Sequence, residues 1–180
     1  MRILTTYPIP ESERWRQETT LVTPEAAGGL WGLVNCLARP LGFRDLRIPV
    51  RLLRIRKDYD VLISGAERED CLFALLQTLL GGRRISHVMT CCLWKRERHP
   101  LVYWIKRILM RLVSRSVSRF VVWSTEEIEG YARYFGIDGN RWIFLPHHAT
   151  LNGYEVTPAL GEYLFAGGDS SRDYATLLEA

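Results

Sequence analysis

Two glycine pairs stand where the backbone could approach a ligand closely. Gly167 and Gly168 lie between an expected short strand and an expected helix, and Ser170 and Arg172 follow them. Glycine has no side chain to hinder a close approach, and the free N–H groups of a helix N-terminus bind phosphate. The Ser170 hydroxyl would add a hydrogen bond and the Arg172 guanidinium a charge-assisted one. Asp169 opposes phosphate binding, and an ordinary strand-to-helix turn is the alternative interpretation.

The second pair, Gly28 and Gly29, precedes the apolar segment LWGLVNCLARPLG, which is typical of a helix ended by Pro40. Close approach to a ligand is one interpretation, and a glycine pair that packs against a helix is the other. Neither pair forms the GxGxxG fingerprint of dinucleotide-binding proteins, and the sequence contains no GK[ST] phosphate loop. These absences argue against a Rossmann enzyme that uses a dinucleotide.

The segment 100–118 predicts an amphipathic helix with a basic side. From Arg83 to Arg119 the sequence has ten Lys or Arg and one acid, Glu97. At 100° per residue, the apolar set that includes Leu101, Ile105, Ile108 and Leu109 falls on one side of this helix. The basic set on the other side, with Trp104 beside it, is Lys106, Arg107, Arg111 and Arg115.

Basic residues interleaved with tryptophan suit an anionic membrane surface or an anionic acceptor. An ordinary solvated helix face is the alternative for this segment. No nucleic-acid recognition motif accompanies the basic residues, so we expect no nucleic-acid partner.

Composition limits the class of protein. The chain has 180 residues, 47% of them hydrophobic and 24% charged, with a net charge of +4. These values indicate a folded globular protein rather than a disordered one. The four cysteines show no zinc spacing, so we expect reduced thiols and no metal or other cofactor. Neither a signal peptide nor a membrane-spanning run is recognisable, which predicts a cytoplasmic protein, free or peripheral to the inner face of the membrane.

Short apolar runs alternate with helical patterns along the chain. Expected strands lie at 2–6, 60–64, 85–92, 119–123 and 142–145, and expected helices at 67–80, 100–118 and 125–135. Residues 7–27 read as irregular, and residues 48–57 fit either a basic helix or an extended segment. The alternation predicts an α/β fold, a Rossmann-like doubly wound parallel sheet with helices on both faces.

The chain divides into three predicted parts. Residues 1–146 would form the Rossmann-like domain, and residues 147–161, with Pro146 just before them, would form a linker. Residues 162–180 (EYLFAGGDSSRDYATLLEA) read as a strand, a glycine turn and a helix, the first βα unit of an incomplete second domain.

Several segments together resemble the group 1 (family four) glycosyltransferases of the GT-B fold. They are the start MRIL, the glycine pair before an apolar helix, YDVLISG, RFVVWSTEEIEGYARYFGIDGNRWIFLPHH and YLFAGGDSSRDYATLLEA. The resemblance covers most of the chain and is strongest from Arg119 to Ala180. The order and spacing of the segments carry it, rather than one diagnostic motif.

The resemblance implies transfer of a sugar from a nucleotide-diphosphate donor to an acceptor, which would be lipid-linked or a polysaccharide, without a bound metal. By position, Gly167, Gly168, Ser170 and Arg172 match the first phosphate-side loop of the donor domain. Gly28 and Gly29 match the glycine loop of the acceptor-side domain.

The family's residues for the nucleotide sugar lie further into the second domain than Ala180, so the 180 residues alone are expected to be inactive. The catalytic base is not identifiable. The alternative function is a standalone Rossmann-like module that binds an anionic membrane or another ligand without catalysis.

Overall fold

The described part of the chain forms one sheet of six parallel strands. The computed structural model describes residues 1–7, 12–23, 30–81 and 85–146. The strands are β1 (Ile3–Thr5), β2 (Thr19–Leu21), β3 (Val61–Ser64), β4 (Ser86–Met89), β5 (Val117–Val122) and β6 (Trp142–Phe144). Their order across the sheet is β2-β1-β3-β4-β5-β6, and every pair is parallel.

The direction in which the chain winds changes beside β1. The connection from β1 to β2 runs toward one edge of the sheet, whereas β3 to β6 follow one another toward the other edge. This reversal is the mark of a doubly wound sheet, and it makes the neighbouring strands β1 and β3 the topological switch point.

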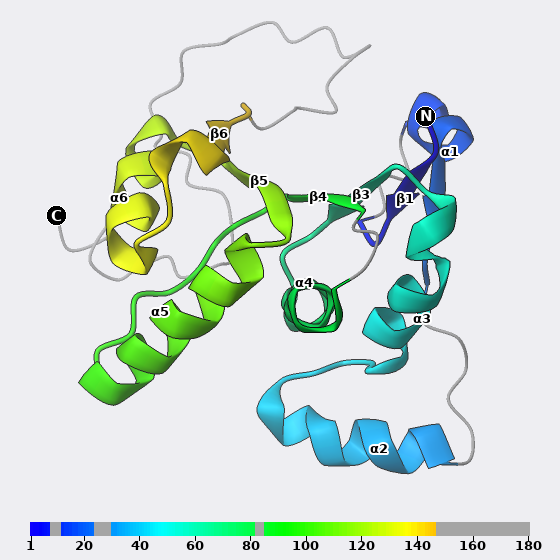
Figure 1. Ribbon diagram of the computed structural model, residues 1–180, viewed down its shortest axis with the longest axis horizontal. Helices are drawn as coiled ribbons and strands as arrows, with labels where there is room; N and C mark the ends of the chain where they lie inside the picture. Colours follow the sequence, from blue (N-terminus) through cyan, green and yellow to red (C-terminus); the bar gives the residue numbers. More distant parts are fainter. Residues whose placement is uncertain (8–11, 24–29, 82–84, 147–180) are drawn as a thin grey trace, which may run out of the picture. The chain divides into compact units, whose positions relative to one another are not determined.

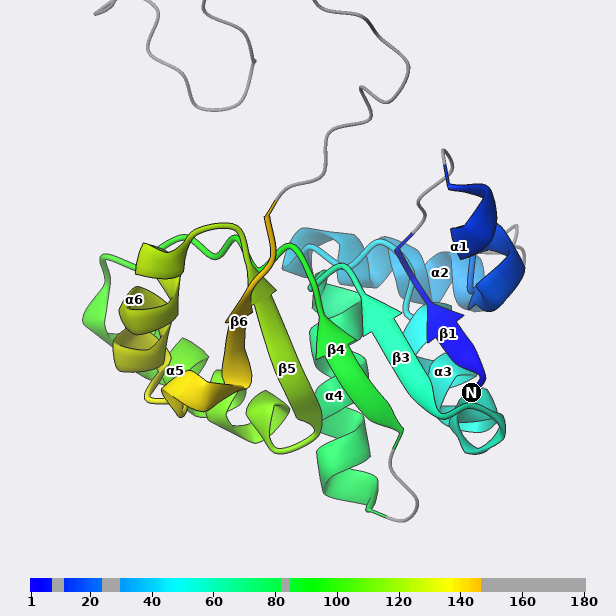
Figure 2. The ribbon, with the colours of Figure 1, turned by 90° about the horizontal axis from the view of Figure 1, so that it is seen from above.

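Six α-helices lie in the described part of the chain. They are α1 (Glu13–Glu18), α2 (Leu30–Ala38), α3 (Arg47–Ile55), α4 (Arg68–Leu80), α5 (Pro100–Ser114) and α6 (Thr125–Phe135). Figures 1 and 2 show α3, α4 and α5 together on one face of the sheet. Successive right-handed crossovers from β3 to β6 place their helices on a common face.

Local sequence explains where α4 and α6 begin. Glu67 and Asp70 form a reciprocal capping box at the start of α4, and Ser124 and Glu127 form one at the start of α6. Each box provides partners for backbone N–H groups that the first helical turn leaves free. Gly136 ends α6 in the left-handed conformation.

The core lies between the sheet and its helical layer, in two clusters. One joins β1 and β3 to α3 and α4 through residues such as Leu4, Leu52 and Phe73. The other surrounds Phe120 and Phe135 and fills the space among β4, β5, β6, α5 and α6. Trp94, Tyr131 and Trp142 pack edge-on or stacked within this second cluster.

The α/β parallel sheet is confirmed, with some differences in its elements. The region 7–27, expected to be irregular, contains α1 and β2, and the undecided segment 48–57 lies mostly in α3. Helix α5 ends at Ser114 rather than 118, because Ser116 donates a hydrogen bond to Ala74 O and Val117 enters the core. The predicted linker 147–161 and second-domain start 162–180 lie outside the described residues.

Candidate functional site

The predicted phosphate-binding residues lie outside the part of the chain that the structure describes. They are Gly28, Gly29, Gly167, Gly168, Ser170 and Arg172. Their role in binding a donor phosphate therefore stays a prediction.

The basic residues in the middle of α5 form an ion pair and hydrogen bonds within the protein. Lys106 forms an ion pair with Glu97 at 2.7 Å and donates a second hydrogen bond to Lys95 O. Arg107 donates to the Tyr103 hydroxyl, and its guanidinium carbon lies 5.7 Å from the centre of the Trp104 ring. Both basic side chains are half-buried, so neither extends freely into solvent.

The basic residues near the end of α5 lie at the C-termini of α6 and of α5 itself. Arg111 is exposed and donates from Nε to Gly136 O at 3.3 Å, where α6 terminates. Arg115 is the C-cap residue of α5 and is exposed. Cations at these positions stabilise the partial negative charge at a helix C-terminus.

The apolar side of α5 faces outward. Leu101, Ile105, Ile108 and Leu109 are exposed, whereas Met110 and Val113 are buried. The side of the helix that packs inward contains half-buried Lys106 and Arg107, and most of the apolar set expected from the sequence lies on the outward side.

The loop before α5 explains this orientation. The Tyr131 hydroxyl accepts the N–H of Trp94, and the Tyr134 hydroxyl accepts the N–H of Glu97, both from α6. Tyr103, in the first turn of α5, donates to Tyr134 O. These contacts fix the polar side of α5 against α6 and leave the apolar side uncovered by α6.

Helix α2 also exposes apolar side chains. Leu30, Leu33 and Leu37 are all exposed, at spacings of three and four residues that place them on one side of the helix. The opposite side is held by Asn35, which donates to Asp45 Oδ1 and accepts the N–H of Leu46.

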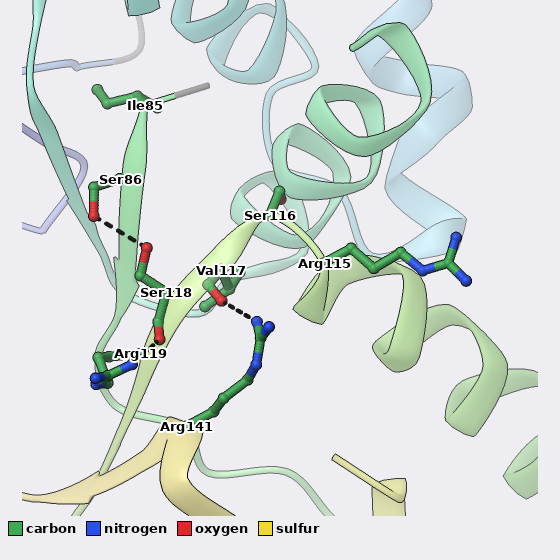
Figure 3. Close-up of a pocket in the computed structure, with 8 residues that line it drawn as sticks. All are labelled: Ile85, Ser86, Arg115, Ser116, Val117, Ser118, Arg119 and Arg141. Carbon is green, nitrogen blue, oxygen red and sulfur yellow. Dashed lines mark hydrogen bonds between the residues drawn. The ribbon is translucent and has the colours of Figure 1, made fainter. Parts of the chain in front are cut away.

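An arginine-rich pocket of about 440 Å³ lies at the amino ends of β4 and β5. Its lining residues are Ile85, Ser86, Arg115, Ser116, Val117, Ser118, Arg119 and Arg141. Figure 3 shows the Arg141 guanidinium turned toward Val117 O, with the side chains of Arg115 and Arg119 directed away from it.

Arg141 Nη1 donates to both Ser114 O and Val117 O, the carbonyls at the end of α5 and the start of β5. Helix C-termini carry partial negative charge, which repels anions. The arginines of this pocket therefore compensate local carbonyl groups, and the pocket is a poor candidate for an anion site.

The carboxyl edge of the sheet is the stronger candidate. Ligands of open α/β sheets bind outside the carboxyl ends of the strands at the topological switch point. Here two non-glycine residues have left-handed backbone, Ala66 after β3 with φ 58° and Cys91 after β4 with φ 55°. Such conformations are costly and concentrate at functional sites.

Side chains join the ends of β1 and β3 at this edge. Thr6 donates its hydroxyl hydrogen to Asp70 Oδ1 at 2.9 Å, and Asp70 Oδ2 accepts the N–H of Glu67. The Tyr7 ring lies over Gly65, where a Cβ would come within 3.2 Å of Tyr7 Cδ2. Glycine at position 65 therefore leaves room for the tyrosine ring at the strand end.

Burial raises the pKa of the Asp70 carboxyl to about 6, against the opposing effect of its hydrogen bond from Thr6. The sequence explains Glu67, Glu69 and Asp70 as acids at a helix N-terminus, and the capping box supports that explanation. Glu69 accepts the N–H of Asp45 as well. The sequence does not predict the hydrogen bond from Thr6 to Asp70, because nothing in it pairs Thr6 with a residue 64 positions away.

Groups of three or more metal-binding side chains do not occur among the described residues. Cys36, Cys71, Cys91 and Cys92 are free thiols, and burial raises the pKa of Cys71 to about 12. Within the same residues, no helix has the length and apolar content that crossing a bilayer requires.

Comparisons of the chain with protein-family models, with curated proteins and with solved structures found no match.

Proposed function

We propose that this chain is the acceptor-side part of a glycosyltransferase that takes a sugar from a nucleotide-diphosphate donor. The acceptor would be a lipid-linked molecule or a polysaccharide at the cytoplasmic face of a membrane. The observation that supports the proposal most is the carboxyl edge of the parallel sheet, where β1 and β3 form the switch point and residues with left-handed backbone follow β3 and β4. The segments that resemble group 1 glycosyltransferases agree with it.

Sugar transfer from such a donor releases a nucleoside diphosphate, and catalysis requires charge stabilisation as this group leaves. Backbone N–H groups of a glycine turn and a nearby arginine provide this stabilisation in a preorganised site. In the proposal, Gly167, Gly168, Ser170 and Arg172 perform this role, and Gly28 and Gly29 approach the donor from the first domain. In this proposal, stabilisation of the leaving diphosphate requires no metal ion.

The described residues of the carboxyl edge would bind the acceptor. Tyr7 presents an aromatic ring at the end of β1, and sugar rings pack well on aromatic faces, which combine apolar area with a polar group. Asp70 is 2% exposed, so it orients Thr6 rather than touching a substrate. We assign it as a positioning residue.

A second candidate function is a module that binds membranes without catalysis. The exposed apolar side of α5 favours it, because that surface has no role in sugar transfer itself. The two candidates differ in one measurement, since only the first predicts turnover of a nucleotide sugar.

The test is a transfer screen with the full-length gene product, including any coding sequence downstream of Ala180, against a panel of nucleotide sugars. We expect transfer from at least one donor. Gly65→Ala should reduce kcat/KM by about tenfold, because the new Cβ displaces the Tyr7 ring at the acceptor side.

Gly139→Ala is the matched control, since a Cβ at Gly139 meets no atom within 4 Å. It should leave kcat/KM unchanged. Absence of transfer from every donor, with the protein folded, would contradict the proposal and favour the membrane module.

A further inference from the structure

Helix α5 carries an exposed apolar row, defined here as Leu101, Val102, Trp104, Ile105, Ile108 and Leu109. Trp104 and Ile108 are each 55% exposed, and Ile105 is 51% exposed. Large contiguous apolar surface is uncommon on soluble proteins and marks an interaction site.

The row is continuous in space. At 100° per residue its six side chains occupy an arc of about 160°, and at 1.5 Å per residue they extend roughly 12 Å along the helix. The buried residues Met110 and Val113 lie outside this arc, toward the core. The row is therefore a single apolar surface along one side of α5.

Cations lie beyond both ends of the row. Arg98 precedes it and is exposed, and Arg111 and Arg115, which are also exposed, follow it. No acidic residue occurs in α5. An apolar centre with cationic ends matches the interface of a phospholipid bilayer, where hydrocarbon meets phosphate headgroups.

Helix α2 adds a second apolar surface on the same side of the sheet. Its exposed leucines are Leu30, Leu33 and Leu37. Figure 1 shows α2 and the Pro100 end of α5 farther from the sheet than α3 and α4. These two helices are thus placed to reach a flat surface before the rest of the helical layer does.

We propose that the apolar row of α5 inserts into the interface of a lipid bilayer, with α5 parallel to the membrane plane and α2 as a second contact. The occupant is the bilayer rather than a second copy of the chain. A two-fold copy would bring one cationic end of the row against another in either orientation, and like charges repel.

This inference goes beyond sugar transfer and holds whether or not the chain takes part in it. It also assigns a different anchor from the basic side that the sequence suggests. Lys106 is paired with Glu97, and Arg107 is half-buried beside Tyr103, so neither is available as the main anchor. Binding should therefore occur on neutral lipids and persist at high salt, where screening removes electrostatic attraction.

The test is sedimentation of the full chain with vesicles of pure phosphatidylcholine, in 0.1 M and 1 M salt (roughly 10 Å and 3 Å Debye length). We expect partitioning onto neutral vesicles at both concentrations. Leu109→Gln should weaken it about tenfold, and the triple change Ile105→Gln, Ile108→Gln and Leu109→Gln should abolish it.

Leu21→Gln is the matched control. Leu21 on the edge strand β2 is 42% exposed, nearly the same as Leu109 at 43%, and it lies outside the apolar row. The control should bind vesicles as the unchanged protein does. Far-UV circular dichroism verifies that all variants keep the fold, which is expected because every changed side chain is exposed.

Vesicles with brominated acyl chains provide a second readout. Trp104 should be quenched by bromine near the acyl-chain boundary, and Trp104→Phe should remove most of the quenching. Trp104→Phe is informative even when vesicle binding is unchanged, because the loss of quenching reports the depth of residue 104 in the bilayer rather than the affinity for vesicles.

Three results would overturn the proposal. They are binding that requires anionic lipid and disappears at 1 M salt (roughly 3 Å Debye length), equal loss in the Leu21 and Leu109 variants, and a Leu109-dependent dimer in analytical ultracentrifugation without vesicle binding. None of these depends on transfer activity, so failure here is distinct from failure of the proposed function.

Discussion

His87 shows how one buried polar residue links the stability of this protein to pH. The ring is fully buried on β4, with Nε2 2.8 Å from Ser64 Oγ and the Phe73 ring edge-on beside it. Burial lowers the pKa of His87 from 6.5 to about 3. The imidazole is therefore neutral in the folded protein throughout the neutral and mildly acidic range.

We predict that His87 destabilises the protein as pH falls from about 6.5 toward about 3. In this window His87 binds a proton in the unfolded chain but not in the folded chain. The free energy of unfolding therefore decreases as the pH is lowered, by up to about 1.4 kcal/mol per pH unit. Replacing the residue by His87→Gln should make the dependence shallower. Urea denaturation at a series of pH values measures it.

His99→Gln is the control for this prediction, because the His99 side chain is exposed whereas that of His87 is fully buried. Asp70 acts with the opposite sign: its pKa is raised from 3.8 to about 6, so the folded chain binds the extra proton between these values. Asp70→Asn should therefore steepen the loss of stability on acidification. A pH profile identical in all three variants would contradict both assignments.

At the scale of elements, the end of α6 depends on one backbone conformation. Gly136 has φ 65°, and a Cβ there would approach the guanidinium nitrogens of Arg111 and Arg107. Those side-chain ends can move, so the main cost of a larger residue is the left-handed backbone.

We predict that Gly136→Ala lowers the unfolding free energy by about 1–2 kcal/mol. Gly139→Ala, three residues further on, should be neutral or slightly stabilising, because Gly139 lacks positive φ and has open space around it. Urea denaturation of both variants compares them directly. Equal destabilisation of the two variants would contradict the assignment of the cost at Gly136 to its left-handed backbone.

Helix α5 shows both what the sequence could predict and what it could not. Its periodicity separates an apolar from a basic side, and the structure keeps that separation. Which side faces the core depends on Tyr131 and Tyr134 of α6, which hold the preceding loop. Such contacts between distant segments leave no periodic signal in α5 itself.

The missed strand β2 has a different explanation. It has three residues, Thr19–Leu21, and is half-buried or exposed, so it carries no apolar run. It forms because β1 provides a parallel partner. Short edge strands are defined by a neighbour's hydrogen bonds more than by their own sequence.

At the scale of the whole molecule, β1 is an interior strand of the sheet although it is the first of the described strands in sequence order. It pairs with β2 on one side and β3 on the other. The candidate site at the carboxyl edge depends on this arrangement, since Thr6 reaches Asp70 only when β1 lies beside β3. The strand pattern predicts the fold class, but it does not predict that β1 lies between β2 and β3.

We predict that a variant lacking residues 1–6 loses the cooperative unfolding transition, because it leaves β3 without one partner and β2 without any. A variant ending at Pro146 keeps all six strands and should unfold with nearly the same urea midpoint as the full chain. Circular dichroism during urea denaturation measures both. Loss of the transition on truncation at Pro146 would contradict the predicted domain boundary.

The interior position of β1 also matters during synthesis on the ribosome. Strand β1 is translated before both of its partners and can meet β2 soon afterwards, but its other edge stays open until α2, α3 and β3 have been translated. An unpaired strand edge in a nascent chain is prone to aggregation. Chaperones that hold short extended segments would therefore engage this protein at β1, while its synthesis is still in progress.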